Sequence, residues 1–340
     1  MRPEGPAAPV CSSPSRCGTA WRLQVHSPAS HFSPNVEDVP AEDRDPPLTE
    51  HLHARADSLD RVPLAELLAV MNDGDRQVPE AVRSQIVHIA ALVDEVVRRV
   101  QRGGGLHYFG AGTSGRLCVL DAAECPPTFG VPSTLVQAHL AGGPTALTQA
   151  VEGAEDDAAA GRREAIASVG AGDVALGVAA SGETPYVKGA IGAAREWGAF
   201  TAALVCAAGS SLAREAELAI EVPVGPEIVA GSTRLKAGSA QKLVLNMVST
   251  AACWRLGHVY RGRMVDVRVT NAKLRRRAVR TVADLAGESE PDAEAALEAG
   301  GGVKPAVVML ALGVGAEVAE ARLRESGGDL RAALRGAGRA

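Results

Sequence analysis

One stretch constrains the fold of this chain more than any other, because it joins a strand pattern, a glycine-rich loop and a helix pattern. Residues 106–109 form a short apolar and aromatic run that predicts a buried strand. Gly110, Gly112 and Gly115 follow, and glycine permits both a sharp turn and a close backbone approach to a ligand. Residues 116–124 then predict a helix with one apolar side facing a core.

This predicted helix has a polar start and is expected to end at Pro126 and Pro127, which cannot continue its hydrogen bonding. Thr113 and Ser114 place hydroxyls at its N-terminus, where free N–H groups favour an anion. The pattern Gly-x-Gly-x-x-Gly alone is a weak sign of a dinucleotide site. The Thr–Ser pair favours a phosphate or sugar hydroxyls, and no clear acidic ribose-binding residue follows at the usual spacing. A plain tight turn is the alternative.

Further apolar runs alternate with helical patterns along the chain. Short strands are predicted at residues 133–138, 174–179, 199–205 and 218–222. This alternation predicts an α/β fold with a doubly wound parallel sheet. Residues 48–100 precede it with helical patterns, whose apolar stripe is expected to cover the sheet or a subunit partner.

A second hydroxyl-rich loop follows the strand predicted at residues 174–179. Ser181, Gly182 and Thr184 precede Pro185, which suits the first turn of a helix. Loops at the carboxyl ends of parallel strands meet in one crevice, so two such loops favour a sugar-phosphate site. Each loop taken alone is equally well explained as a helix cap.

A third polar segment opens the long helix predicted over residues 231–250. Ser232 and Thr233 are candidate caps, and the basic residues Arg234 and Lys236 follow. A capped, charged amphipathic helix is the simpler interpretation. A third loop that enters the same crevice is the functional alternative.

Three carboxylates are candidates for acid–base chemistry. Glu124 lies among small and apolar residues, where partial desolvation would raise its pKa as a general acid or base requires. Glu152 and Glu155 are three residues apart and share a face if they lie on a helical turn. A solvated acidic face is the simpler interpretation of that pair, and the pairing with Glu124 favours function. His258 has no nucleophilic partner that the pattern places, so a structural role is expected.

Composition excludes several classes of partner and site. The net charge of −5 and the aromatic content of 3% argue against nucleic acid as the main partner. No apolar run is long enough to span a membrane. The six cysteines are scattered without metal-type spacing, so they are expected to be reduced thiols in the cytoplasm and no metal site is expected.

The chain divides into three predicted parts. Residues 1–46 are rich in proline, serine and other polar residues and are expected to be a disordered leader. Residues 47–278 hold the predicted sheet with its N-terminal helices. Residues 279–340 contain three short helical patterns broken by glycines, and they predict a small helical domain.

Several linked motifs together resemble those of the N-acetylmuramic acid 6-phosphate etherase family. The resemblance covers about residues 47–335 and is carried by residues 109–117, 120–130, 150–157, 179–187 and 231–238. It implies a sugar isomerase (SIS) domain, a UBA-like C-terminal bundle and a homodimer. The implied reaction cleaves the C3 lactyl ether of N-acetylmuramic acid 6-phosphate with water, giving N-acetylglucosamine 6-phosphate and D-lactate, without metal or redox cofactor.

The resemblance also implies roles for individual residues. Glu124 matches the family's proton donor and Glu155 its second catalytic carboxyl, while Glu152 would contact sugar hydroxyls. The phosphate and sugar would be bound by Gly112, Thr113, Ser114, Gly115, Ser181, Gly182, Thr184 and Ser232.

Two positions depart from the family pattern, and two other functions remain open. Cys118 replaces a usual glycine, and Glu183 stands where a basic residue is common. A sugar-phosphate isomerase would share the crevice but would not require the motifs around Glu124 and Glu155. A non-catalytic phosphosugar sensor is the stronger alternative, although such proteins usually carry two SIS domains and this chain has length for one.

Overall fold

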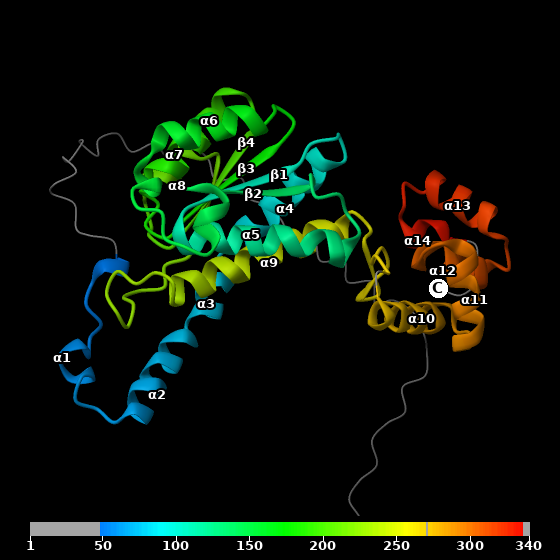
Figure 1. The fold of residues 1–340 in the computed structure, drawn as a ribbon, viewed down its shortest axis with the longest axis horizontal. Helices are drawn as coiled ribbons and strands as arrows, with labels where there is room; N and C mark the ends of the chain where they lie inside the picture. The colour runs from blue at the N-terminus through cyan, green and yellow to red at the C-terminus, as the bar shows by residue number, and fades with distance from the viewer. Residues whose placement is uncertain (1–47, 270, 336–340) are drawn as a thin grey trace, which may run out of the picture. The chain divides into compact units, whose positions relative to one another are not determined.

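The computed structural model describes residues 48–269 and 271–335, and the predicted leader at 1–46 lies outside them. At its centre is a five-stranded parallel sheet in the order β2-β1-β3-β4-β5 (Figure 1). The strands are β1 (Leu106–Gly110), β2 (Val136–Leu140), β3 (Val174–Ala179), β4 (Phe200–Val205) and β5 (Leu218–Glu221). The strand order reverses at β1, so the carboxyl ends of β1 and β3 flank a crevice of the kind that holds ligands in doubly wound sheets.

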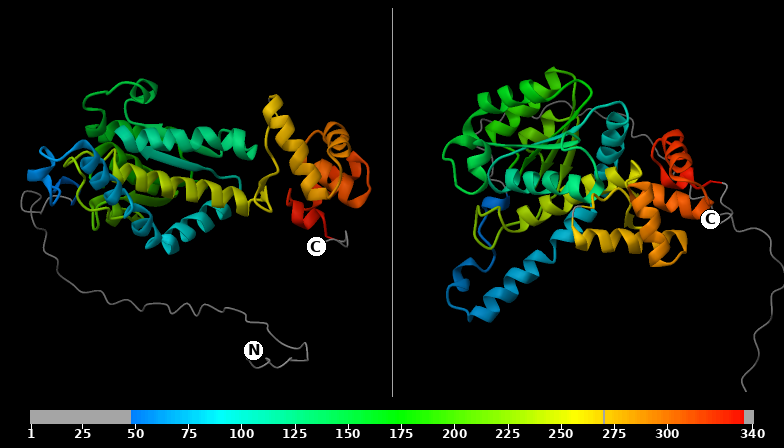
Figure 2. Two further views of the ribbon diagram at one scale, coloured as in Figure 1. Left: turned by 90° about the horizontal axis from the view of Figure 1, so that it is seen from below. Right: turned by 45° about the vertical axis from the view of Figure 1, so that its right-hand side comes forward.

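Helices cover both faces of the sheet, as the alternating pattern predicts. The first face packs against α3 (Val78–Arg83), α4 (Ile86–Val100), α5 (Gly112–Phe129) and α9 (Lys236–Arg255). The second packs against α6 (Ala158–Ser168), α7 (Pro185–Glu196) and α8 (Ser211–Glu215). Figure 2 shows α5 and α9 side by side on their face of the sheet. The remaining N-terminal and connecting elements are η2 (Leu48–Glu50), α1 (Ala56–Leu59), α2 (Leu64–Asp75), η3 (Gly143–Leu147) and η4 (Ala154–Asp156).

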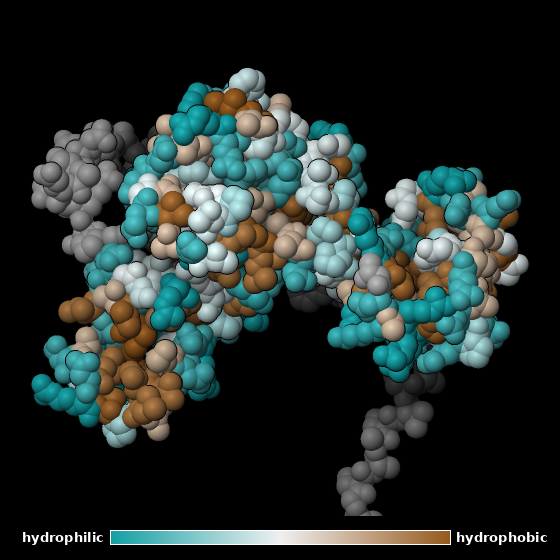
Figure 3. All heavy atoms as spheres, in the orientation of Figure 1, coloured by the Kyte–Doolittle hydropathy of each residue, from teal (hydrophilic) through white to brown (hydrophobic). Residues whose placement is uncertain are grey.

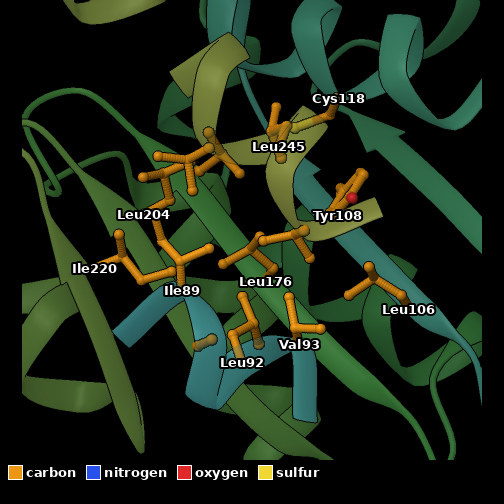
Figure 4. Close-up of a cluster of buried hydrophobic side chains, with 14 of the residues drawn as sticks. Ile89, Leu92, Val93, Leu106, Tyr108, Cys118, Leu176, Leu204, Ile220 and Leu245 are labelled. Atoms are coloured by element: carbon orange, nitrogen blue, oxygen red, sulfur yellow. The ribbon is translucent and has the colours of Figure 1, made fainter. Parts of the chain in front are cut away.

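Alternation along the strands divides the core into two clusters. Leu106 and Tyr108 on β1 point into the cluster under α4, α5 and α9, while Phe109 points into the cluster under α7. Figure 4 shows the first cluster, which contains Leu176 of β3 and Leu245 of α9. Every strand residue of β1 and β3 is buried, as expected for parallel strands covered on both faces.

The helix after β1 does not end at the prolines, so that prediction is wrong. Pro126 and Pro127 lie inside α5, which continues to Phe129. Proline has a helix-compatible φ, and its cost is a missing N–H donor and crowding of the preceding turn. The helix ends instead at Gly130, which has a φ of 69° and donates its N–H to the Pro126 carbonyl.

Two other helical segments differ from the prediction. The continuous pattern over residues 78–100 is two helices, α3 and α4, separated at Ser84 and Gln85. The long helix α9 begins at Lys236, with neither Ser232 nor Thr233 at its cap.

The C-terminal part of the chain is helical. It follows a two-stranded hairpin, β6 (Val259–Tyr260) and β7 (Arg263–Met264), and its helices bury a cluster of their own. They are α10 (Ala272–Ala286), α11 (Glu290–Gly300), α12 (Val303–Leu312), α13 (Ala316–Glu325) and α14 (Leu330–Ala333). The UBA-like resemblance and the boundary at residue 278 stay predictions. Within residues 48–269 and 271–335 no single helix is long and apolar enough to cross a membrane, and only α11 with α12, bent by 118°, match in length and composition.

Candidate functional site

The loop after β1 is shaped by close packing of glycines. A Cβ on Gly115 would lie 2.5 Å from the Gly110 carbonyl oxygen and 2.4 Å from Leu140 Cδ1, so only glycine lets α5 start this close to the strand. Gly112 has a φ of 53°, a region that side chains rarely adopt. Thr113 and Ser114 are consequently held, half-buried, in the first turn of α5.

The loop after β3 lies beside it at the same edge of the sheet. Gly110 and Val178 are register partners in the β1–β3 ladder, so the two strands end together. Gly182 has a φ of 69°, and a Cβ there would lie 2.1 Å from Ser210 Oγ. The Ser181 hydroxyl accepts a hydrogen bond from the Glu183 N–H at 3.2 Å. The strand register therefore brings together the two hydroxyl-rich loops that the sequence predicts.

The Glu183 carboxylate is hydrogen-bonded to the start of α8. Its two oxygens accept hydrogen bonds from the backbone N–H and hydroxyl of Ser211, at 2.8 and 2.5 Å. Burial raises the pKa of Glu183, but the Ser211 hydrogen bonds and the charge of Lys188 outweigh it and the net shift is downward. This carboxylate is engaged by α8, although it lies next to a loop for which the sequence predicts phosphate binding.

Arg116 of α5 binds the turn that precedes the acidic segment. The Arg116 Nε donates to the carbonyls of Ala146 and Leu147, at 2.9 and 3.2 Å. The following η4 contains Glu155 and packs on α7, the helix that begins after Thr184. Glu152 and Glu155 are both exposed there.

Glu152 and Glu155 do not lie on one helical turn, so the condition for a shared face is not met. Gly153 lies between them with a φ of 72°, and this left-handed residue starts the 3-10 turn η4. Spacing alone predicts a shared face only when the intervening backbone is helical.

The start of α9 packs beside the loop after β1. Gly238 packs on Thr113, with 3.4 Å from a built Cβ to Thr113 Cγ2. A cleft of about 460 Å³ opens here between α5, α9 and the end of α2. Its polar and charged lining residues are Asp75, Thr113, Arg234, Ser239 and Lys242. Ser232 lies in the segment that leads to α9 but does not line this cleft.

Glu227 is the cap of α9 that the sequence did not reveal. It is fully buried, and its carboxylate accepts hydrogen bonds from the N–H groups of Lys236 and Ala237 at 3.1 and 2.9 Å. The Lys236 ammonium donates to the Val224 carbonyl at 2.7 Å. A cap that lies nine residues before the helix cannot be recognised from the local sequence, whereas Ser232 and Thr233 match the usual pattern of an N-cap.

Asp121 is a second buried carboxylate that sequence reasoning missed. Its Oδ1 accepts from Asn246 Nδ2 and Ser249 Oγ, at 2.6 and 3.0 Å, and its Oδ2 accepts from the Tyr108 hydroxyl at 3.0 Å. The pKa of Tyr108 is raised by burial and by the Asp121 charge. Asp121 thereby joins β1, α5 and α9. The signal that could have identified it is an acidic residue on the buried side of a predicted helix.

A polar chain on the other side of β1 was also missed. His107 Nδ1 lies 3.1 Å from His139 Nε2, and His139 Nδ1 lies 3.1 Å from Glu164. The Tyr186 hydroxyl donates to Glu164 at 2.9 Å. Burial and the His139 charge lower the pKa of His107 to about 4, although the Asp173 carboxylate opposes them.

The four cysteines in the described residues are buried, which makes their thiols poor nucleophiles. Burial raises the pKa of Cys125 and of Cys206 to about 12, which keeps both thiols neutral. His258 Nδ1 lies 2.7 Å from Asp266, in keeping with the structural role expected for it. Among the described residues no cluster of three or more metal-ligating side chains forms.

Glu124 is not brought to the two loops within the chain. It lies on α5 eleven residues beyond Thr113, which corresponds to about 16 Å along the helix. It is also exposed, so the desolvation expected for it is not present in the single chain. Thr113 and Ser114 and the loop after β3 lie at one edge of the sheet, whereas Glu124 lies toward the far end of α5.

Two family models match the part of the chain that contains the sheet. Residues 88–195 match the family described as glucokinase regulatory protein N-terminal SIS domain, and residues 151–251 match the SIS domain. A phosphoheptose isomerase structure from Francisella tularensis has 15% identity and a TM-score of 0.46, covering 57% of this chain and 100% of that one.

Curated relatives are far more similar in sequence. The N-acetylmuramic acid 6-phosphate etherase of Serratia proteamaculans is 52% identical over 278 residues, which cover 81% of this chain and 94% of the relative. That of Pectobacterium atrosepticum is 52% identical over 281 residues, covering 82% and 93%. Identity at this level over nearly the whole relative shows that the chain belongs to the N-acetylmuramic acid 6-phosphate etherase family.

Proposed function

We propose that this protein is a carbon–oxygen lyase that cleaves the D-lactyl ether at C3 of N-acetylmuramic acid 6-phosphate. Water is consumed, and the products are N-acetylglucosamine 6-phosphate and D-lactate. The observation that carries the proposal is the 52% identity to curated etherases over 81% of the chain. The paired hydroxyl loops after β1 and β3 support a phosphorylated sugar as the substrate.

The chemistry explains why carboxyl groups are needed. An ether oxygen is a poor leaving group, but the open-chain sugar has an aldehyde at C1 that acidifies the proton on C2. A carboxylate removes this proton, the C3–O bond breaks, and a carboxylic acid protonates the departing lactate oxygen. Water then adds to C3 of the unsaturated aldehyde, and a proton returns to C2.

In this proposal Glu124 is the proton donor and Glu155 is the second catalytic carboxyl. Thr113 and Ser114 bind the phosphate from the first turn of α5, assisted by the backbone of Gly112 and Gly115. The second loop contributes Ser181, Gly182 and Thr184. Glu152 contacts sugar hydroxyls, and Ser232 binds substrate from the segment before α9.

D-lactate release from N-acetylmuramic acid 6-phosphate by the purified protein tests the proposal. We expect release by the parent and a loss of about 100-fold or more in kcat for Glu124→Gln and for Glu155→Gln. Asp94→Asn, a change at an exposed position on α4, is the control and retains parental activity. A parent that binds the substrate but releases no lactate would rule out the etherase.

A phosphosugar sensor is the second candidate, favoured by the match of residues 88–195 to the regulatory-protein SIS family. A sensor needs the two phosphate loops but not Glu124 or Glu155. It would bind sugar phosphates saturably, and neither glutamine variant would change that binding.

The cytoplasmic location and the homodimer are also part of the proposal. The four cysteines in the described residues are buried and form no disulfide, as expected in a reducing compartment. A phosphorylated substrate agrees with the same compartment. The case for two copies of the chain rests on exposed apolar side chains, Leu120 on α5 and Met247 and Trp254 on α9.

A further inference from the structure

A small pocket adjoins the cleft beside Thr113. Its volume is about 200 Å³, and α2, residues 226–228 and the start of α9 line it. Asp75, Arg234 and Ser239 line both the pocket and the cleft, so the two spaces share a boundary. Pockets for drug-sized ligands measure roughly 300–1,000 Å³, so this one suits a small substituent of a ligand that is bound in the cleft.

A buried ammonium group lines this pocket. Lys236 is 8% exposed, and its Nζ donates a hydrogen bond to the Val224 carbonyl at 2.7 Å. In the part of the chain that the structure describes, this carbonyl is the single partner of the Nζ, although an ammonium group has three donors. A buried charge is costly unless a group of opposite charge is paired with it. The Lys236 ammonium therefore favours a ligand that brings a carboxylate or another anion.

The two acidic side chains that line the pocket are not paired with the Lys236 ammonium. Glu227 is fully buried, but its oxygens accept hydrogen bonds from the backbone N–H groups of Lys236 and Ala237. Asp75 is exposed at the end of α2. Arg234 is exposed where the pocket meets the cleft, so a second cation stands at the entrance.

The wall that α2 supplies is mostly apolar. Val70 and Met71 line the pocket, and both are half-buried. Figure 3 shows apolar side chains gathered over α2, at the lower left of the view. Gly74 leaves room beside them, since a Cβ built there would lie 3.6 Å from Lys236 Cδ. A pocket with an ammonium group and an apolar wall suits a short group that has both a carboxylate and a methyl.

The start of α9 keeps the pocket close to the loop after β1. Gly238 packs on Thr113 in the first turn of α5, and it lies two residues after Lys236. Cα atoms two residues apart on a helix are separated by about 5–6 Å. A single amino sugar can therefore reach from the hydroxyls of this loop to the pocket.

From this arrangement, and resting on the proposed function, we propose that the pocket binds the D-lactyl group of the substrate. Lys236 pairs with the lactyl carboxylate, and Val70 and Met71 contact the lactyl methyl group. The sugar lies in the cleft, and its phosphate is bound at the hydroxyl-rich loops. Lys236 thereby distinguishes the substrate from N-acetylglucosamine 6-phosphate, which has no carboxylate.

The lactyl carboxylate keeps its charge throughout the reaction. When the C3–O bond breaks, the electron pair goes to the ether oxygen, and the carboxylate of the released D-lactate is unchanged. Lys236 therefore binds the substrate and the transition state about equally. Loss of such an interaction raises KM and leaves kcat nearly unchanged.

Two ligands separate the lactyl pocket from the phosphate site. The KM is measured for N-acetylmuramic acid 6-phosphate, and the inhibition constant is measured for N-acetylglucosamine 6-phosphate. We expect Lys236→Met to raise the KM about tenfold or more, because a hydrogen bond to a charged group is lost. The kcat should stay within about threefold of the parent, and the inhibition constant should stay close to the parental value.

Lys242→Met is the matched control for this variant. Lys242 lines the cleft but not the pocket, so its loss should leave the ratio of the KM to the inhibition constant as in the parent. An equal rise of both constants in Lys236→Met would assign Lys236 to the fold or to a part that the two ligands share. That result overturns the proposal, and so does a Lys236→Met protein with an unchanged KM.

Gly74→Leu tests the pocket without removing a charge. Leucine has a higher helix propensity than glycine, and the Cβ has an ordinary contact distance, so we expect the fold to persist. The side chain fills the pocket and should raise the KM about tenfold or more, with the inhibition constant unchanged. Gly192→Leu on α7 is the control, since no atom of the described residues lies within 4 Å of its built Cβ, and both constants should stay parental. A parental KM in Gly74→Leu would overturn the proposal.

Failure of the proposed function is recognised separately. A parent that releases no D-lactate contradicts the etherase reaction. Equilibrium dialysis of the same two ligands then tests the pocket, because binding requires no turnover. A parent that binds N-acetylmuramic acid 6-phosphate no more tightly than N-acetylglucosamine 6-phosphate would show that the pocket does not hold the lactyl group.

Discussion

The side-chain amide of Asn246 on α9 donates a hydrogen bond of 2.6 Å to Asp121 on α5. Ser249 and Tyr108 donate to the same carboxylate, so one buried group joins two helices and a strand. These are the two helices that line the cleft beside the loop after β1.

Replacement of Asp121 by alanine should be strongly destabilising. Three donors, of which Tyr108 and Ser249 are buried and Asn246 is half-buried, would lose their acceptor. We expect the free energy of unfolding to fall by about 2–4 kcal/mol. Asp121→Asn keeps an oxygen for Asn246 and Ser249, and its amide can donate to the Tyr108 hydroxyl, so the loss should be less than half as large. Urea unfolding of both variants checks this order, and equal losses would contradict it.

Alanine substitutions at Gly182 and Gly209 distinguish the effect of backbone strain from that of a steric clash. Gly182 and Gly209 have φ values of 69° and 66°, so alanine is strained at either by about 1–2 kcal/mol. Only at Gly182 does a Cβ meet other atoms, 2.1 Å from Ser210 Oγ, while nothing lies within 4 Å at Gly209. We expect Gly182→Ala to raise the KM for the sugar phosphate about tenfold or more, since ~1.4 kcal/mol of lost binding suffices. Gly209→Ala should leave the KM near the parental value, and an equal rise in both variants would show that the clash is irrelevant.

Removal of the Glu183 carboxylate should affect stability more than substrate binding. Glu183→Ala takes the acceptor from the Ser211 N–H, and we expect a loss of about 1 kcal/mol in the free energy of unfolding. The KM should stay close to that of the parent, because the carboxylate is held by α8. Steady-state kinetics check this, and a several-fold fall in KM would mean that Glu183 repels the phosphate.

The buried His107 should make the protein less stable in mild acid. Its pKa is about 4 in the folded chain against an ordinary value of 6.5, so the unfolded chain binds the extra proton between these values. Stability therefore falls as pH drops from about 6.5 to about 4, by on the order of 3 kcal/mol in total from this group. The lowered pKa of Glu164, caused first by its hydrogen bond with His139, acts in the same direction.

Urea unfolding as a function of pH checks this effect. His107→Gln should flatten the dependence of unfolding free energy on pH between 4 and 6.5. His88→Gln, at an exposed position on α4, should leave the dependence as in the parent. A parental slope in His107→Gln would assign the acid sensitivity to other groups.

The sequence predicted the sheet and its loops well because strong local patterns encode them. The strand at residues 174–179 has the observed bounds, and Pro185 is the first residue of α7. Continuous apolar runs between glycine-rich turns leave few other structures for such a chain.

The parts that the sequence did not predict depend on contacts between distant residues. The α9 cap comes from Glu227, and the donors to Asp121 come from β1 and α9. Pro126 was expected to end a helix, but α5 continues beyond it to Phe129. The separation of Glu124 from Thr113 follows from helix geometry, but it has meaning only once the loops are placed.

The fate of the ether oxygen tests the central claim most directly. The reaction is run to completion in water enriched in oxygen-18, and both products are analysed by mass spectrometry. If the C3–O bond breaks and water adds at C3, the amino-sugar phosphate gains one heavy oxygen at C3, beyond the exchange of its aldehyde oxygen, and D-lactate gains none in its hydroxyl. Heavy oxygen in the lactate hydroxyl, or no lactate at all, would contradict the account.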